Sequence, residues 1–366
     1  MAICHGTKQH KMKNLFSPLK LRNLELKNRI VVSPMQQFSA NDGFSNDWHL
    51  VHYGSRAVGG AGLIITESII VEPEGRSTKN DLGIWKEEHI EGLTKITTFI
   101  HENNAKVAIQ LAHFGSKGSK SHPNEGFLPL TIENGGWQTV SASEKTPFPG
   151  MSVPKKLTVN EIEIIQNKFV DASIRAINAG FDAIEIHAAH GYLFHQFYSQ
   201  LINDRTDNYG GSFENRIRFL VETVQKIRNV IPEQMPLLVR ISAVDYVDED
   251  KAWKIEDSVK LTNILKENGV DMVTASGGGF VWVDKSMVME GYQVPFAEQI
   301  KSETGITTGS VGGIVSASFA NDLIVNNKTD LVVIAREFLR DPYFPIHAAK
   351  ELKQEIEIPW QYKRAF

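Results

Sequence analysis

The chain repeats one pattern, in which a short apolar run ends in small, polar or ionisable residues and an amphipathic segment follows. Runs of Val, Ile and Leu without alternation are typical of parallel strands that are buried on both faces. We find eight such runs, at residues 29–33, 63–67, 106–111, 183–187, 237–241, 272–275, 306–310 and 331–335. Helical spacing lies between them, as at residues 89–103, 159–179, 212–230, 257–268 and 315–326. Eight β-then-α units predict an α/β protein, a single (β/α)8 TIM barrel.

The segments outside this repeat predict two additions to the barrel. Residues 15–28 resemble a hairpin that closes the barrel bottom. Residues 113–157 follow the third strand and contain five prolines, so we expect a lid over the carboxyl ends of the strands. A doubly wound open sheet is the alternative fold, and it would have fewer strands.

Composition limits the possible partners. A net charge of −4 over 366 residues, without a long basic run, favours small-molecule ligands over nucleic acid or a membrane. The single cysteine, Cys4, rules out an intrachain disulfide and fits a reducing compartment, so we expect a cytoplasmic protein. We expect residues 1–12 to be a disordered leader and residues 13–366 to form one domain.

The ends of strands seven and eight predict a phosphate site. Residues 308–313 are small and glycine-rich, and Ala335 and Arg336 close the last strand. Small residues let backbone N–H groups approach an anion, the next helix N-terminus adds its dipole, and Arg336 adds charge. In a TIM barrel, phosphate groups commonly bind beyond these two strands.

A cation lies inside the fifth apolar run. Arg240 needs an anionic neighbour, because burying an unpaired charge costs several kcal/mol. One interpretation pairs it with Glu185 of the neighbouring strand. The other places it against a cofactor that becomes negative on reduction, as flavin does near N1. Gln110, at the end of strand three, can donate to and accept from the amide edge of a heterocycle.

The densest group of reactive side chains follows strand four: His187, His190 and Tyr192. A third metal ligand at fitting spacing is not evident, so we expect no metal. Two imidazole N–H groups can hold a carbonyl oxygen while charge develops on it, and the phenol can protonate a neighbouring carbon. Together with the phosphate site and Arg240, these residues indicate an FMN enzyme that reduces a polarised double bond.

At these residues the sequence resembles the Old Yellow Enzyme family of FMN-dependent ene reductases, most closely its thermophilic-like branch. The likeness runs from about Leu15 to Phe366, and its motifs include Gln110 to His113, His187 to Tyr192 and Asn203 to Ser212. It implies that NADPH or NADH reduces bound FMN and leaves, and that an α,β-unsaturated carbonyl compound or similar alkene then takes hydride from flavin N5.

The resemblance also implies a role for each matching residue. His187 and His190 bind the substrate oxygen, and Tyr192 is the proton donor. Arg364 enters the site of a neighbouring subunit in a homodimer or homotetramer; the alternative is a frayed tail. The residues expected around FMN are Ser33, Pro34, Met35, Gln36, Ser68, Gln110, Arg240, Gly312, Ala335 and Arg336.

Two positions depart from the branch, which has Cys where this chain has Gln36 and Tyr where it has Phe38. We expect altered redox tuning of the flavin from the first change and a more apolar substrate pocket from the second. Three rival functions stay open: a flavin-independent lyase or isomerase acting on a phosphorylated substrate, a flavin-binding sensor without turnover, and an RNA-reducing flavin enzyme.

Overall fold

The computed structural model describes residues 13–146, 148–281, 286 and 288–365. The predicted leader, at residues 1–12, lies outside the described residues.

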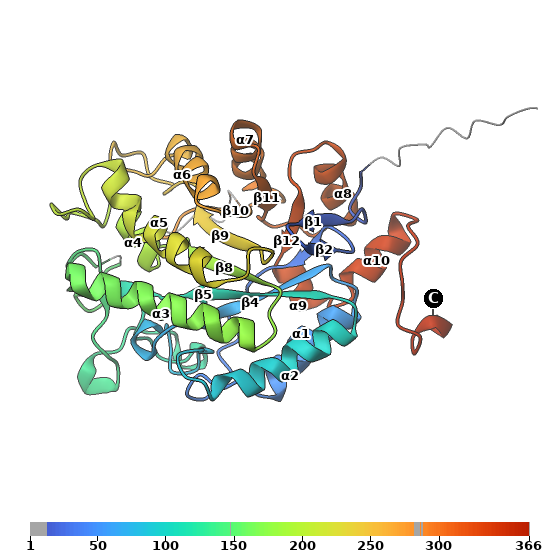
Figure 1. The fold of residues 1–366 in the computed structure, drawn as a ribbon, viewed down its shortest axis with the longest axis horizontal. Coiled ribbons are helices and arrows are strands. Elements are labelled where there is room, and N and C mark those ends of the chain that lie inside the picture. The colour runs from blue at the N-terminus through green and yellow to red at the C-terminus, as the bar shows by residue number, and fades with distance from the viewer. Residues whose placement is uncertain (1–12, 147, 282–285, 287, 366) are drawn as a thin grey trace, which may run out of the picture.

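Eight parallel strands close into a barrel, which confirms the predicted fold (Figure 1). Their order around the barrel is β10, β11, β12, β3, β4, β5, β8 and β9. Strand β4 runs three residues past its predicted end, and its register with β5 shifts between Ile65 and Ser68. The strands are β3 (Ile30–Val32), β4 (Leu63–Ile70), β5 (Lys106–Ala112), β8 (Ala183–Ala188), β9 (Leu237–Ser242), β10 (Met272–Ser276), β11 (Thr307–Ser310) and β12 (Leu331–Ile334).

Helices surround the barrel, as Figure 1 shows. They are α1 (Asp47–Val58), α2 (His89–Glu102), α3 (Val159–Asn178), α4 (Leu193–Tyr198), α5 (Phe213–Val230), α6 (Ile255–Glu267), α7 (Val294–Thr304), α8 (Ala317–Val325), α9 (Arg336–Arg340) and α10 (Phe344–Glu351). Where the sequence predicts a helix, the observed bounds differ by at most two residues. The hydroxyl of Ser212 accepts from the amide of Asn215, so this side chain caps α5 as its sequence context suggests.

Apolar side chains fill two layers. One layer lies between the strands and the helices, and the other lies inside the barrel. The inner layer includes Leu21, Leu24 and Leu26, which come from the antiparallel hairpin of β1 (Leu19–Leu21) and β2 (Leu24–Leu26). Burying one leucine contributes about 1.5–3 kcal/mol, so the hairpin stabilises the end of the barrel that it closes.

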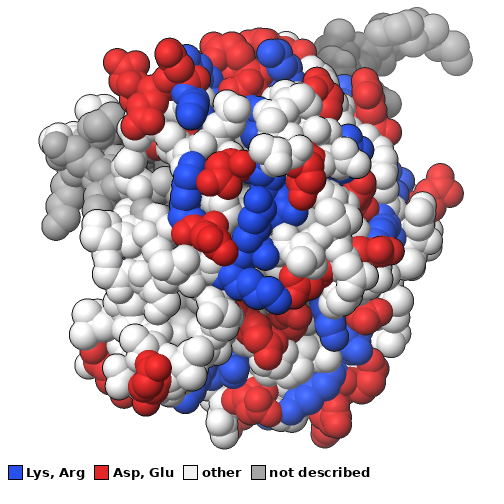
Figure 2. Space-filling model, turned by 90° about the vertical axis from the view of Figure 1, so that its left-hand side faces the viewer, with Lys and Arg blue, Asp and Glu red and all other residues white. Residues whose placement is uncertain are grey.

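The segment 113–157 after β5 is irregular apart from three short 3-10 turns and the strand pair β6 (Val140–Ser141) and β7 (Lys155–Lys156). Its rings Phe114 and Phe127 line a cavity together with residues from the strand ends, so the segment lies over the barrel mouth as predicted. Figure 2 looks onto this side of the molecule, where Lys and Arg side chains are interspersed with Asp and Glu. Within the described residues, no helix has the length and apolar character needed to cross a membrane.

Candidate active site

Strand register gathers the predicted residues at the carboxyl ends of four neighbouring strands. Ser68 of β4 pairs with Gln110 of β5, and Gln110 pairs with Glu185 of β8. His187 of β8 pairs with Arg240 of β9. Because the strands are parallel, residues from distant parts of the sequence reach one mouth.

The two histidines form a hydrogen-bonded pair. The amide of Ala189 donates to Nδ1 of His187 at 3.1 Å, so His187 carries its proton on Nε2. That nitrogen is 3.2 Å from Nδ1 of His190, whose Nε2 is 2.7 Å from the hydroxyl of Ser276. The chain of bonds leaves each ring with one N–H, and both are in use. His187 must release His190, and His190 must release Ser276, before both rings can donate to a substrate.

Burial keeps both imidazoles neutral. It lowers the pKa of His187 and of His190 well below the ordinary value, and the positive charge of Arg240 lowers both further. Neutral rings hold an oxygen by donating hydrogen bonds and add no full charge of their own.

Tyr192 lies beside this pair. The centre of its ring is 4.8 Å from that of His187 and 4.2 Å from that of Phe114 in the segment above it. Burial raises the pKa of Tyr192, and the carboxyl group of Asp81 raises it further. The phenol therefore keeps its proton at neutral pH and is available as a donor.

Arg240 is buried without a carboxylate contact. Its Nη1 donates to the hydroxyl of Ser33 at 3.1 Å, and its Nε has no partner in the part of the chain that the structure describes. Glu185 instead accepts from Gln110 at 2.7 Å and from Thr274 at 3.1 Å. The direct Arg240–Glu185 ion pair considered from the sequence is therefore wrong. Burial raises the pKa of Glu185, while the charge of Arg240 lowers it.

Gln110 belongs to a row of amides and hydroxyls that leads to Gln36. Its Oε1 accepts from the hydroxyl of Ser68 at 2.8 Å, and Nε2 of Gln36 donates to the carbonyl of Ser68 at 3.4 Å. This row presents both donors and acceptors to the mouth, which suits a planar heterocycle with an amide edge.

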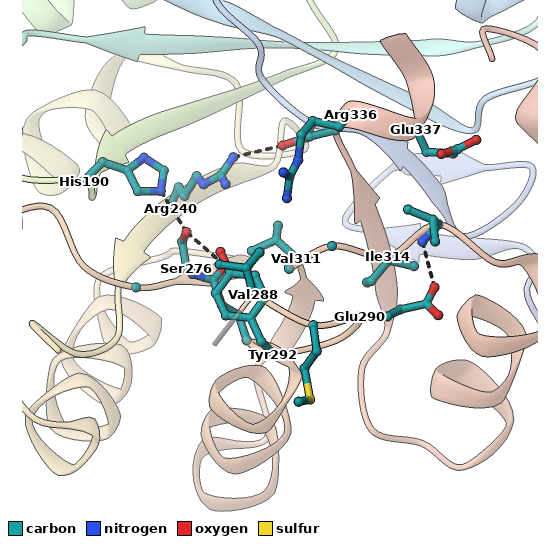
Figure 3. Close-up of a pocket in the computed structure, with 18 of the residues that line it drawn as sticks. His190, Arg240, Ser276, Val288, Glu290, Tyr292, Val311, Ile314, Arg336 and Glu337 are labelled. Carbon is teal, nitrogen blue, oxygen red and sulfur yellow. Dashed lines mark hydrogen bonds between the residues drawn. The ribbon is translucent and has the colours of Figure 1, made fainter. Parts of the chain in front are cut away.

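A cavity of about 440 Å³ extends from Arg240 and Ser33 to the ends of β11 and β12. Figure 3 shows the guanidinium groups of Arg240 and Arg336 on the same side of it. The side chain of Arg336 makes no ion pair or hydrogen bond among the described residues, and neither do the amides of Gly312 and Gly313. Gly312 has φ +116, and a Cβ there would lie 2.8 Å from the amide nitrogen of Gln293.

The predicted contribution of the α8 N-terminus needs correction. The carboxylate of Glu290 accepts from the amides of Val315 and Ser316 at 2.8 Å each. The protein's own anion already satisfies these groups, so a bound phosphate would have to rely on Arg336 and the glycine amides instead.

A smaller cavity of about 140 Å³ adjoins the first at Arg240 and His190. Of the residues predicted from the sequence, it is lined by Pro34, Gln36, Phe38, Ser68, Gln110, His187, His190, Tyr192 and Arg240. The larger cavity has Ser33, Gly312, Ala335 and Arg336 in its wall. The two cavities together thus contain nearly the whole predicted set.

Two predicted residues lie elsewhere. Met35 packs its side chain against the outer core layer. Arg364 is exposed in the 3-10 turn Lys363–Ala365, and the tail beside it lies against Gly60 and Asn104, which precede β4 and β5 at the opposite end of the barrel. Within its own chain, Arg364 does not reach the site.

The sequence did not single out Ser276, Lys117 or Lys120, all of which line the mouth. The serine closes a strand, and strand ends are where reactive groups were sought, so it could have been found. A loop lysine has no such signature. The described residues contain no group of His, Cys, Asp and Glu that could hold a metal ion.

Comparison with known proteins places these features in a family. The model of the NADH:flavin oxidoreductase / NADH oxidase family matches residues 14–355. NADPH dehydrogenases from Bacillus velezensis and from Bacillus subtilis are each 44% identical to the chain, over 97% of it and 99% of their own length.

Solved structures agree with the sequence comparison. Morphinone reductase has a TM-score of 0.77 at 25% identity, over 96% of this chain and 92% of its own. Its complex with tetrahydroNAD has a TM-score of 0.75 at 26% identity, over 94% of this chain and 92% of its own. A 2-naphthoyl-CoA reductase has a TM-score of 0.83 at 23% identity, over 92% of this chain and 52% of its own. At this identity the likeness shows the fold alone.

Proposed function

Since the chain belongs to the NADH:flavin oxidoreductase / NADH oxidase family, the Old Yellow Enzyme family, and is an NAD(P)H-dependent FMN oxidoreductase, we propose that it is an ene reductase. Its proposed reaction is reduction of the C=C bond of α,β-unsaturated carbonyl compounds and similarly activated alkenes. The flavin-independent lyase or isomerase considered from the sequence is not compatible with membership in this family.

The residues at the mouth fit FMN. A phosphate group matches the unpaired Arg336 and the free amides of Gly312 and Gly313. The unpartnered Nε of Arg240 offers a cation to a ring that gains negative charge. The residues that would hold FMN are Ser33, Pro34, Gln36, Ser68, Gln110, Arg240, Gly312, Ala335 and Arg336, and in that position the cofactor supplies the hydride chemistry.

The substrate carbonyl would bind at His187 and His190. Each neutral ring donates one N–H to the oxygen, which draws electrons from the conjugated alkene and stabilises negative charge on that oxygen. Tyr192 then gives its phenolic proton to the alkene carbon nearer the carbonyl. Phe114 and Phe127 close this pocket with apolar rings and limit the access of water to it.

One observation carries the proposal: two neutral imidazoles and a protonated phenol share a cavity with a buried arginine that has no carboxylate partner among the described residues. His190→Ala tests it, since the variant removes one of the two donors to the carbonyl. We expect oxidation of the reduced enzyme by an enone to slow by roughly 10²-fold, while reduction by NADPH changes much less. Stopped-flow absorbance of the flavin measures the two half-reactions separately.

His347→Ala is the matched control, because this exposed histidine of α10 pairs with Asp341 far from the mouth. It should leave both half-reactions unchanged. Equal slowing of the two half-reactions by His190→Ala would remove the assigned role of His190.

The finer assignments are also proposals. They place the enzyme in the thermophilic-like branch, in the cytoplasm, as one FMN-binding domain over residues 13–366 that assembles into a homodimer or homotetramer. Gln36 and Phe38 line the small cavity at the positions where that branch has Cys and Tyr. Flavin potential and substrate range are therefore expected to differ from those of the branch.

A further inference from the structure

A third cavity, of about 610 Å³, opens beside the proposed carbonyl site. It shares Ser77, Phe114, Phe127, His190 and Tyr192 with the small cavity, so the two spaces are continuous. A ligand whose carbonyl contacts His190 would extend past Tyr192 into this space.

The described walls of the third cavity are mostly apolar, and two lysines supply their charge. Phe148, Pro149 and Met151 are among the apolar lining residues. The titratable residues among the described part of the lining are His190, Tyr192, Lys117 and Lys120. The histidine and the tyrosine are neutral at neutral pH, as their shifted pKa values indicate. Among the described residues that line the cavity, the ionisable charge is therefore exclusively positive.

Lys117 is tied to the catalytic loop by neutral groups alone. Its Nζ donates to the carbonyl of His190 at 2.8 Å and to that of Gly279 at 2.9 Å, and it lies 5.3 Å from the centre of the Tyr192 ring. These contacts use two of three N–H donors and supply no countercharge. Burial, together with the positive charge of Lys120, lowers the pKa of Lys117 to about 7.

Lys120 has a similar environment. Its Nζ lies 4.4 Å from the centre of the Phe127 ring, and no described carboxylate is within ion-pair distance of it. Among the described residues, the negative charge that affects Lys120 is that of Asp81. The carboxylate of Asp81 already accepts four hydrogen bonds from Ser77 and Thr78. Burial still lowers the pKa of Lys120 despite the Asp81 charge.

Two other lysines of the same segment do have acidic partners. Lys145 lies 3.8 Å from Asp204, and Lys155 pairs with Glu161. On this side of the molecule the two signs of charge are interspersed, as Figure 2 shows. Lys117 and Lys120 thus differ from Lys145 and Lys155, since they are desolvated and have no countercharge among the residues that the structure describes.

We infer that Lys117 and Lys120 form an anion-binding site, and that the substrates of this enzyme are activated alkenes that carry a carboxylate. The carboxylate would take the remaining donor of Lys117 and the ammonium of Lys120, while the apolar walls hold the rest of the ligand. This inference rests on the proposed ene reductase function, because it assigns the substrate class of the same site. The phosphates of the nicotinamide donor have the same anionic chemistry, so the test must separate them from a substrate carboxylate.

Steady-state kinetics with acetylacrylate and with its primary amide provides the first test, because the two alkenes differ essentially in charge. We expect Lys120→Gln to raise KM for the carboxylate about tenfold, the value of one charge-assisted hydrogen bond, and to change KM for the amide less than about twofold. Lys120→Arg should restore the preference. Lys79→Gln is the matched control, because Lys79 is an exposed lysine of this region that lies outside all three cavities. It should leave KM unchanged for both substrates.

Calorimetric binding to the oxidised holoenzyme provides a second test that does not depend on turnover. Levulinate should bind more tightly than levulinamide to the wild type, and the difference should shrink in Lys117→Gln and Lys120→Gln. Added salt should weaken the binding of levulinate alone. Circular dichroism checks that the Lys117 variant is folded, because its ammonium joins two loops.

The outcomes separate the two proposals. A wild type that reduces neither alkene contradicts the ene reductase function, whereas equal binding of levulinate and levulinamide contradicts the anion site. An equal increase of KM for acetylacrylate and for its amide in Lys120→Gln also overturns the inference. If the variants raise KM for NADPH and leave acetylacrylate unaffected, the anion is the dinucleotide's, and the assigned substrate class is wrong.

Discussion

A single backbone amide determines how the two histidines can act. Ala189 donates to Nδ1 of His187 and so places the proton of that ring on Nε2. Both rings stay neutral, with one N–H each, because burial and Arg240 disfavour a second proton on them. The positions of His187, His190 and Tyr192 after strand four could be predicted from the sequence. The bond between the two rings could not, since it depends on the left-handed backbone of His190 at φ +57.

Glu67 is a second buried group with a measurable consequence. It accepts from Tyr53 and from the amide of Gln37 at 3.0 Å each, and it therefore holds the loop that carries Gln36. Burial raises the pKa of Glu67 to about 8. The folded protein thus keeps a proton that the unfolded chain loses near pH 4.5, and stability falls as pH rises between these values.

Glu67→Gln removes this titration. We expect the free energy of unfolding of the variant, relative to wild type, to increase between pH 5 and pH 8 by at most roughly 1.4 kcal/mol per pH unit. Urea unfolding of both proteins at the two pH values measures the difference, with exposed Glu74→Gln as the control. If the difference in unfolding free energy between variant and wild type does not change with pH, Glu67 is ionised in the folded protein.

At the scale of elements, periodicity made the barrel predictable. All eight strands and the five named helices occur where the sequence placed them, because each has a continuous apolar face. Contacts between distant elements were not predictable. The N-terminus of α8 binds Glu290, twenty-five residues before Val315, and no local pattern indicates that a carboxylate would replace a ligand there.

The turn after β11 gives a prediction at this scale. Gly312→Ala would place a Cβ 2.8 Å from Gln293 at φ +116, so the turn must move and its amide with it. We expect the variant to lose at least about tenfold in FMN affinity, as measured by quenching of flavin fluorescence.

Gly211→Ala is the matched control, because Gly211 also has positive φ, at +78, but nothing lies within 4 Å of an added Cβ. It carries the backbone strain without the clash and lies away from the cavities. Unchanged FMN affinity in Gly312→Ala would argue against a phosphate at this turn.

At the scale of the whole molecule, the C-terminal tail is the part that one chain leaves unexplained. Trp360 is 77% exposed, and the tail lies at the end of the barrel opposite the mouth. Trp and Tyr side chains are enriched at contacts between protein chains. The sequence resemblance assigns Arg364 to a neighbouring subunit, and its position is consistent with that assignment because it cannot serve its own site.

Truncation after Pro359 should therefore lower turnover and the oligomeric state together. Light scattering during gel filtration gives the mass, and alkene reduction under steady-state conditions gives the turnover. Arg364→Ala should lower turnover and leave the mass unchanged, which separates the two roles of the tail. A truncated enzyme with full activity would show that the tail has no part in the site.

The central claim is that a flavin at the barrel mouth passes reducing equivalents from a nicotinamide to an activated alkene. Anaerobic titration of the purified protein tests this most directly. NADPH or NADH should bleach the flavin absorbance, and one equivalent of an enone should restore it with formation of the saturated ketone. A protein that stays colourless after addition of FMN, or one whose reduced flavin only oxygen reoxidises, would contradict the account.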